Sequence, residues 1–194
     1  MTGPRALAIG GTAITAIVLA WVLFFVLPQR FGRRQQTSAA AAAATPSEAA
    51  PGRKIKAHLF YVAEDGVRLV GVERDVAFGD TTLQQARELV AAQIAPVSDP
   101  LVSAIPAGTT LRALFVTDRG EAFVDLSREV SAAHPGGTVS ELLTIYTIVN
   151  ALTENLPAIT AVQLLVDGKE VDTLAGHIDL RRPLTKNLAT APQP

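Results

Sequence analysis

Apolar and polar positions form paired runs at three places along the chain, and each pair surrounds a turn that contains Asp and Gly. The turns are Asp65-Gly66, Asp118-Arg119-Gly120 and Asp167-Gly168. Apolar runs of strand length on both sides of such a turn are typical of β-hairpins. The pattern therefore predicts three hairpins.

Two longer segments between the hairpins repeat apolar residues at intervals of three and four, as amphipathic helices do. They are TLQQARELVAAQI (residues 82–94) and TVSELLTIYTIVNALTEN (residues 138–155). The second also carries Leu143, Tyr146 and Ile148 outside its main stripe, so it is either covered on two sides or offers an apolar surface to a partner. The order ββ-α-ββ-α-ββ predicts an α/β (α+β) sandwich, in which the three hairpins form a sheet and both helices pack on it.

Residues 6–27 contain no charged side chain and are mostly apolar. As a helix this segment would be about 33 Å long, enough to cross the hydrocarbon core of a bilayer. A cleaved signal peptide has a shorter apolar core with a cleavage site close behind it, whereas Arg30, Arg33 and Arg34 follow here. The sequence favours an uncleaved transmembrane helix that anchors the protein in the lipid bilayer.

The anchor divides the chain into parts of different composition. Residues 1–5 are a short flank, and residues 28–53 are rich in Ala, Pro and Ser, with too few large side chains to build a core. We expect 28–53 to form a flexible tether. The folded domain is expected at 54–188, and a disordered tail at 189–194.

The charges beside the anchor leave its orientation open. One arginine, Arg5, and the amino terminus precede the span, and three arginines follow it closely. Taken alone, the positive-inside rule places the following domain in the cytoplasm. Long domains can cross the membrane regardless of these charges, so both orientations stay open at this point.

Charge and composition exclude several classes of function. Of the 194 residues, 1–53 carry five Arg against one Glu, and the net charge of the chain is −1, so the remainder is mildly acidic. Binding of nucleic acid through charge is not expected of such a domain. The chain has no cysteine, which excludes disulfides, thiol catalysis, Cys-zinc sites and a lipid-modified N-terminal cysteine.

The stretch HPGGTVSELL (residues 134–143) has two interpretations, a phosphate-binding loop or an ordinary helix start. Neither G-x-x-x-x-G-K-[ST] nor G-x-G-x-x-G is present, and Glu141 in the first turn would repel a bound anion. Thr138 and Glu141 have the spacing of a capping box. In this box the hydroxyl accepts from the amide of Glu141, and the carboxylate accepts from the amide of Thr138. We therefore expect a plain cap here.

The candidate catalytic histidines are scattered. No pair among His58, His134 and His177 has helical metal-site spacing, and H-E-x-x-H is absent, so no metal site is expected. On an extended strand His177 and Asp179 would share a face, as a base with its orienting carboxylate or as half a metal site. The favoured interpretation is that His177 packs or caps the chain end and that Asp179 bonds nearby backbone amides.

Asp125 and Asp167 stand at or near the ends of apolar strands, where catalytic carboxylates occur. Asp167 is already explained by its turn, and Asp125 fits a strand that leaves the sheet. No G-x-S-x-G pattern makes Ser127 or Ser140 a nucleophile. We therefore expect no catalytic, cofactor-binding or metal-binding residues and no enzymatic activity.

Five motifs occur in a specific order. They are Ile105-Pro106-Ala107-Gly108-Thr109, Ala122-Phe123-Val124-Asp125-Leu126-Ser127, Gly136-Gly137 at a helix start, Val166-Asp167-Gly168-Lys169 and Gly176-His177-Ile178-Asp179-Leu180. Together they resemble the GerMN domain, a family named after a sporulation and spore-germination protein. The resemblance covers roughly residues 55–185.

The resemblance implies a non-enzymatic α/β module on the outer side of the bacterial cytoplasmic membrane, similar to the ring-building modules of secretion machines. Relatives are often lipoproteins and are linked to the assembly of envelope complexes. This chain departs from them in having a transmembrane anchor in place of a lipidated cysteine, and one copy of the domain. The family supplies no catalytic residues to carry over.

Anchor and resemblance together predict a single-pass protein of the bacterial cytoplasmic membrane with an extracytoplasmic domain. Its expected role is assembly or scaffolding of an envelope complex, through an envelope protein partner or self-association. Neither nucleic acid nor a small-molecule cofactor is expected as a partner. The alternative is a domain that binds or hydrolyses cell-wall glycan with His177 and Asp179, and with Asp125 as a further candidate.

Overall fold

A computed structural model describes residues 52–190 of the chain. The expected flank 1–5 and anchor 6–27 lie outside these residues, as do most of the expected tether 28–53 and the end of the expected tail 189–194. Within the described part, no helix is both long enough and apolar enough to cross a membrane.

The first hairpin is a sheet of its own. Strands β1 (Lys54–Val62) and β2 (Leu69–Ala77) pair antiparallel along their whole length. The expected turn lies between them, where the carboxylate of Asp65 accepts hydrogen bonds from the amides of Val67 and Arg68. Such side-chain bonds to the following backbone are the reason that Asp is common in turns.

The other two hairpins, together with the short strand β7, form a second, five-stranded sheet. β3 and β4 pair antiparallel, β4 and β5 pair parallel, and both β6 and β7 pair antiparallel with β5. The third expected hairpin is therefore present, although its second arm is short. The strands are β3 (Leu111–Val116), β4 (Glu121–Leu126), β5 (Ala161–Val166), β6 (Lys169–Glu170) and β7 (Leu184–Thr185).

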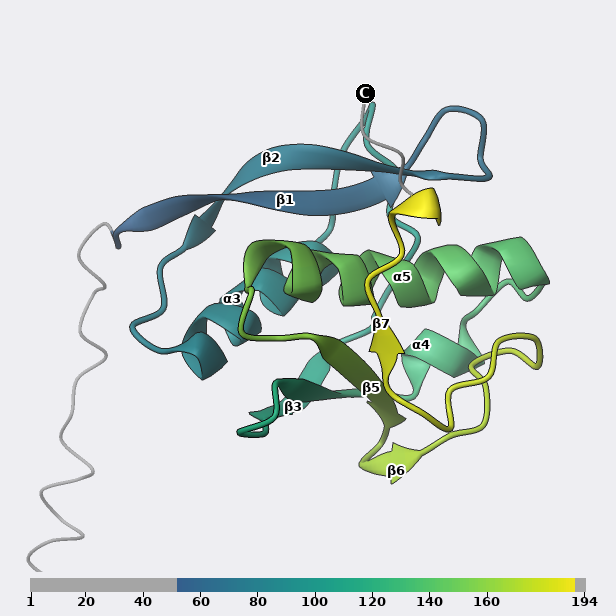
Figure 1. Ribbon diagram of the computed structural model, residues 1–194. Helices are drawn as coiled ribbons and strands as arrows, with labels where there is room; N and C mark the ends of the chain where they lie inside the picture. Colours follow the sequence, from purple (N-terminus) through teal and green to yellow (C-terminus); the bar gives the residue numbers. More distant parts are fainter. Residues whose placement is uncertain (1–51, 191–194) are drawn as a thin grey trace, which may run out of the picture. The chain divides into compact units, whose positions relative to one another are not determined.

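The two long helices lie between the sheets (Figure 1). They are α3 (Thr82–Ile94) and α5 (Thr138–Asn155), with the bounds that the apolar spacing predicts. Both contact β1 on one side, while α3 also contacts β3 and α5 also contacts β5. A short helix that the sequence did not indicate, α4 (Glu129–Ala132), follows β4, and a 3₁₀ turn (Leu188–Thr190) ends the described chain.

The mixed α/β class is confirmed, but the single sheet that we predicted is wrong. The reason lies in α5, whose apolar residues surround most of the helix. Leu143 and Ile148, which lie outside the main stripe, are buried. A helix of this kind needs apolar cover on two sides. The first hairpin covers one side and the second sheet covers the other, so α5 is not left with a bare apolar face.

Side-chain amides from the helices complete the free edge of β1. Asn155 of α5 accepts from the N–H of His58 at 2.9 Å and donates to its carbonyl at 2.8 Å. Gln93 of α3 does the same for Phe60, at 2.9 and 2.8 Å. Each amide supplies the donor and acceptor that a neighbouring strand would supply. These bonds join the first hairpin to the helix layer.

Candidate functional site

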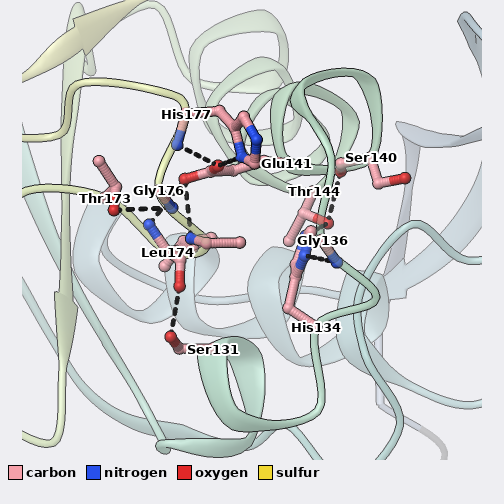
Figure 2. Close-up of polar contacts among 11 residues, drawn as sticks. Ser131, His134, Gly136, Ser140, Glu141, Thr144, Thr173, Leu174, Gly176 and His177 are labelled. Carbon is pink, nitrogen blue, oxygen red and sulfur yellow. Dashed lines mark hydrogen bonds and ion pairs between the residues drawn. The ribbon is translucent and has the colours of Figure 1, made fainter.

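Polar contacts concentrate at the beginning of α5 (Figure 2). The helix starts at Thr138 with Gly137 as its N-cap, and no side chain caps it. The expected capping box of Thr138 and Glu141 is therefore wrong. Gly136 and Gly137 have φ of 82° and 85°, a conformation that glycine adopts freely. Gly137 thus takes the N-cap position that the capping box gives to Thr138, and Glu141 is one residue too far along the helix to reach back to the cap.

Glu141 binds the loop after β6 instead. Its side chain is fully buried, with 0 % exposure. One carboxylate oxygen accepts from the amides of Leu174 at 2.8 Å and Ala175 at 3.0 Å, and the other accepts from the amide of His177 at 2.8 Å. Successive backbone N–H groups that converge on one anion form a concave positive site. The loop thus solvates the carboxylate in place of water.

Two opposing effects act on the pKa of Glu141. Burial raises the pKa because it removes the carboxylate from water, whereas hydrogen bonds from the amides of Ala175, His177, Leu174 and Ile178 lower it. The hydrogen bonds prevail, so the pKa of Glu141 lies below its ordinary value. The carboxylate is therefore charged at neutral pH, despite its burial.

The imidazole of His177 also meets Glu141. Its Nδ1 lies 3.2 Å from Oε2 of Glu141, and the side chain of His177 is 40 % exposed. A half-exposed histidine oriented by a buried carboxylate is an arrangement that can exchange protons. The sequence suggested Asp179 for the orienting role, and the structure assigns it to Glu141.

Asp179 is occupied by a neighbour in the chain. Its carboxylate accepts from the backbone N–H of Arg181 at 3.0 Å, and from the guanidinium of Arg181 at 2.9 and 2.8 Å. The Arg181 side chain holds the pKa of Asp179 well below its usual range. His177 and Asp179 therefore make their contacts with different partners. The bond to a nearby backbone amide is the one that we expected.

His134 organises the loop that leads into α5. Its Nδ1 accepts from the N–H of Gly136 at 2.9 Å, so the proton of the neutral ring resides on Nε2. Nε2 lies 3.1 Å from the hydroxyl of Thr144, and this hydroxyl is in turn 2.7 Å from the carbonyl of Ala104 and 3.0 Å from that of Ser140. These contacts connect two loops to the first turns of the helix.

Asp125 holds the turn of the third hairpin. It is buried, and its Oδ1 accepts from the N–H of Gly168 at 2.7 Å. Its Oδ2 lies 3.3 Å from Nε of Arg112, whose Nη1 lies 3.1 Å from Asp167. These partners differ from those of Glu141, His177 and Asp179.

Ser127, another sequence candidate, also serves the fold. The hydroxyl of Ser127 accepts from the amide of Thr110 at 3.0 Å. Ser131, which the sequence did not single out, donates to the carbonyl of Leu174 and so ties α4 to the loop held by Glu141. Within residues 52–190, no group of three or more His, Cys, Asp or Glu side chains could hold a metal ion.

Sequence reasoning missed the role of Glu141 because its partners lie far along the chain. The one available signal is a glutamate at the start of a helix in which nearly every other position is apolar or small. A carboxylate in such a position needs donors from elsewhere in the fold. The sequence does not say which segment supplies them.

The family model described as Germane, sporulation and spore germination, matches residues 58–172. A search of curated proteins gave no match. One similar solved structure is the tandem GerMN domains of the sporulation protein GerM from Bacillus subtilis. It is 19% identical, with a TM-score of 0.54, and the match covers 69% of this chain and 46% of that chain. This chain thus spans about half of the tandem protein, and the likeness supports the fold.

Two further structures are similar over a comparable part of the chain. A candidate lipoprotein of Clostridium perfringens is 24% identical with a TM-score of 0.49, and the match covers 73% of this chain and 93% of that one. The first GerMN domain of GerM from Bacillus subtilis is 17% identical with a TM-score of 0.48, and the match covers 69% and 96% of the two chains.

Proposed function

Because the chain belongs to the GerMN family of sporulation and spore germination, we propose that it is a membrane-tethered, non-enzymatic module of a bacterial cell-envelope complex. In this role the folded domain contacts a second copy or an envelope protein and helps to assemble the complex. The apolar segment 6–27 holds the protein in the cytoplasmic membrane, and the domain works on its outer side.

The observation that carries this proposal is the use of the candidate catalytic groups as ties within the fold. Glu141 binds backbone amides of a distant loop, Asp125 binds the turn at Gly168, and Asp179 binds Arg181. Side chains used in this way stabilise one shape of the backbone. A fixed surface is what a protein needs when it acts by contact.

The tether supports the same role. A domain held near the membrane by a flexible linker meets its partners at a raised effective concentration, so weak contacts between domains are sufficient for assembly. Residues 28–53 have the composition of such a linker.

A measurement of proximity between copies tests the proposal. The full chain, labelled with donor or acceptor dyes, is reconstituted in lipid vesicles at increasing surface density. We expect energy transfer that rises and saturates with density, either alone or after addition of envelope extract with a cross-linkable partner. Copies that stay apart at every density and that cross-link to nothing in the envelope would overturn the proposal.

Orientation has its own test. A phosphatase active only outside the cytoplasm, fused after Pro194, reports an outer location, and a fluorescent protein that matures only in the cytoplasm reports the opposite. We expect phosphatase activity. Fluorescence would show that the arginines after the anchor determine the orientation.

The pairing of His177 with Glu141 favours one second candidate, a domain that binds or hydrolyses cell-wall glycan. The test is release of reducing sugar from purified cell wall by the full chain and by His177→Ala. The assembly proposal expects no release by either protein. Release that His177→Ala abolishes, while its unfolding free energy stays near that of the unsubstituted chain, would favour the glycan hydrolase.

A further inference from the structure

Backbone groups alternate in direction along the first hairpin. His58 of β1 turns its N–H and carbonyl groups toward the side chain of Asn155, away from β2. Phe60 does the same toward Gln93. Successive residues of a strand point these groups to opposite edges, so the residues of β1 beside His58 and Phe60 bond β2. The residues that lie opposite them on β2 are Val70, Val72 and Arg74.

The intervening residues of β2 point their backbone groups away from β1. They are Leu69, Gly71, Glu73 and Asp75. Within residues 52–190, no other segment forms hydrogen bonds with their N–H or carbonyl groups. The last three of these residues are exposed, and Figure 1 shows β2 as the strand of the hairpin that lies farther from α5. A row of unpaired groups along a strand edge is a template for another strand.

The other strand edges in the described part of the chain are protected. The edge of β1 is completed by Asn155 and Gln93. β3 contains a bulge, and Arg87 donates to the carbonyl of Leu114 in that strand. β6 and β7 are each only two residues long. Bulges, positively charged side chains and short strands are the usual means by which edges avoid pairing, whereas β2 has nine residues in continuous register with β1 and contains no proline.

The charges on β2 limit the ways in which two copies of this strand can pair. Glu73 and Asp75 lie beside Lys56 of β1, which forms ion pairs with them at 3.7 and 2.9 Å. An antiparallel pair centred on Glu73 places this residue opposite its own equivalent in the second copy. A pair centred on Arg74 brings two arginines together and sets Glu73 opposite Asp75. Like charges directly opposite one another are destabilising, so both registers are disfavoured.

An antiparallel pair centred on Val72 avoids these repulsions. Val72 then lies opposite the second copy's Val72, and Gly71 lies opposite Glu73. Val70, which is 37% exposed, lies opposite Arg74, whose aliphatic stem covers apolar surface while the guanidinium stays in water. The outward N–H and carbonyl groups of each strand face complementary groups of the other. This register therefore satisfies the edge without placing like charges opposite one another.

We propose that a second copy of this chain binds the free edge of β2, through antiparallel pairing of the two β2 strands centred on Val72. The result is a four-stranded sheet of order β1-β2-β2-β1. Both copies use the same surface, so the contact closes at two copies. The inference rests on the proposed function, because it names a second copy as the partner and β2 as the surface of contact.

Cysteine substitutions on β2 test this register. The chain has no native cysteine, and opposite residues of a non-hydrogen-bonded antiparallel pair have Cα atoms about 4.5 Å apart, within the range of a disulfide. The full chain in lipid vesicles is treated with a mild oxidant. We expect Val72→Cys to form a disulfide-linked dimer. Val70→Cys, on the same face of the strand, is the matched control, because its equivalents would lie about 13 Å apart along the pair. Equal cross-linking of the two variants would overturn the proposal.

A proline substitution tests whether backbone hydrogen bonds hold the contact. The N–H of Glu73 points away from β1, so Glu73→Pro removes an edge donor without removing a bond within the hairpin, as prolines in natural edge strands do. Glu73→Ala removes the same side chain and keeps the donor. Energy transfer between labelled full chains in vesicles measures association. We expect Glu73→Pro to raise the surface density at half-maximal transfer by about tenfold or more, which corresponds to a hydrogen bond of ordinary strength. Glu73→Ala should change it by less than about twofold.

The possible results separate this contact from the proposed function. Energy transfer that saturates equally in Glu73→Pro and in the unsubstituted chain, without cross-linking of Val72→Cys, would show that copies meet through another surface. That result would overturn the β2 contact and leave the proposed function standing. Energy transfer that needs envelope extract and is lost in Glu73→Pro would show that a strand of another protein occupies the edge, which also overturns pairing with a second copy. Where Glu73→Pro does not fold, the cross-linking of Val72→Cys against Val70→Cys decides.

Discussion

Oε2 of Glu141 lies 3.2 Å from Nδ1 of His177 and also accepts the backbone N–H of that residue, although 36 positions separate the two in the chain. The contact joins the first turn of α5 to the loop after β6. It explains how α5 can hold a fully buried glutamate, because the loop supplies the donors that the buried carboxylate needs.

Removal of the charge on Glu141 should destabilise the domain strongly. In Glu141→Gln one oxygen becomes an NH₂ group, which opposes the backbone donors instead of accepting from them. We expect the free energy of unfolding to fall by about 2–3 kcal/mol, since hydrogen bonds to a charged group are worth this much and the site is closed to water. Urea denaturation measures the loss. Glu88→Gln on the exposed side of α3 is the matched control, with an expected change within about 0.5 kcal/mol. Equal losses in both variants would contradict the role assigned to Glu141.

The contribution of Glu141 should depend on pH in a defined direction. Its pKa is lower in the folded state than its ordinary value of 4.5. The unfolded chain therefore binds the proton first as the pH falls, and acid favours unfolding. We expect the difference in unfolding free energy between the unsubstituted chain and Glu141→Gln to be constant above about pH 4.5 and to shrink as the pH falls below it.

Denaturation curves of both proteins at several pH values give this difference. This difference separates the pH dependence due to Glu141 from that due to Asp65, Asp75 and Asp179, whose pKa values are also lowered. A difference that grows as the pH falls would mean that the assigned direction of the pKa shift is wrong.

The amide side chains of Gln93 and Asn155 should protect individual backbone groups of β1 from hydrogen exchange with water. Gln93→Ala leaves the N–H and carbonyl of Phe60 without their partner in a buried place, at a cost of about 2–4 kcal/mol for two lost bonds. Asn155→Ala affects His58 in an exposed place and should cost about 1 kcal/mol.

Hydrogen exchange read by nuclear magnetic resonance separates the two effects. Under conditions where the domain stays folded, we expect faster exchange at the Phe60 amide in Gln93→Ala and at the His58 amide in Asn155→Ala. Each variant is the control for the other. Uniform acceleration across the first hairpin in both would indicate general loosening instead of local edge protection.

Two glycines with positive φ should differ in their tolerance of alanine. A Cβ at Gly120 would lie 2.6 Å from the carbonyl oxygen of Ala158, whereas a Cβ at Gly136 would meet no atom within 4 Å. Both substitutions strain the backbone, by about 1–2 kcal/mol. Gly120→Ala should cost at least about 2 kcal/mol more, since backbone must shift to make room. Thermal and urea denaturation give the unfolding free energies of the two variants. Equal losses of stability in both would show that the carbonyl of Ala158 moves away without cost.

The elements that the sequence predicts well are those whose cause is local. The turn at Asp65-Gly66 and the apolar spacing of residues 82–94 act over a few positions, and both features occur as expected. The cap of α5 is also local, but Gly137 takes the N-cap position one residue before Thr138, the cap that we expected. This small displacement converts Glu141 from a capping residue into a ligand for a distant loop.

The features that the sequence does not predict depend on contacts between distant segments. No pattern near residue 141 indicates that amides at 174–177 will meet it. The parallel pairing of β4 with β5 places Asp125 opposite Leu165 and so beside the turn at Gly168, which also requires the assembled sheet. Division of the hairpins into two sheets follows from the need to cover α5 on both sides.

The position of β1 has a mechanical consequence for a protein held from its amino-terminal side. In the proposed membrane-tethered role, a pulling force from the amino-terminal side enters the first hairpin at Lys54, the first residue of β1 and the one opposite Ala77. β1 is bonded along its length to β2 and is clamped from its other edge by Asn155 and Gln93. The load therefore spreads over one hairpin and two helices before it reaches the second sheet, and one of these helices, α5, also holds the loop of His177 through Glu141.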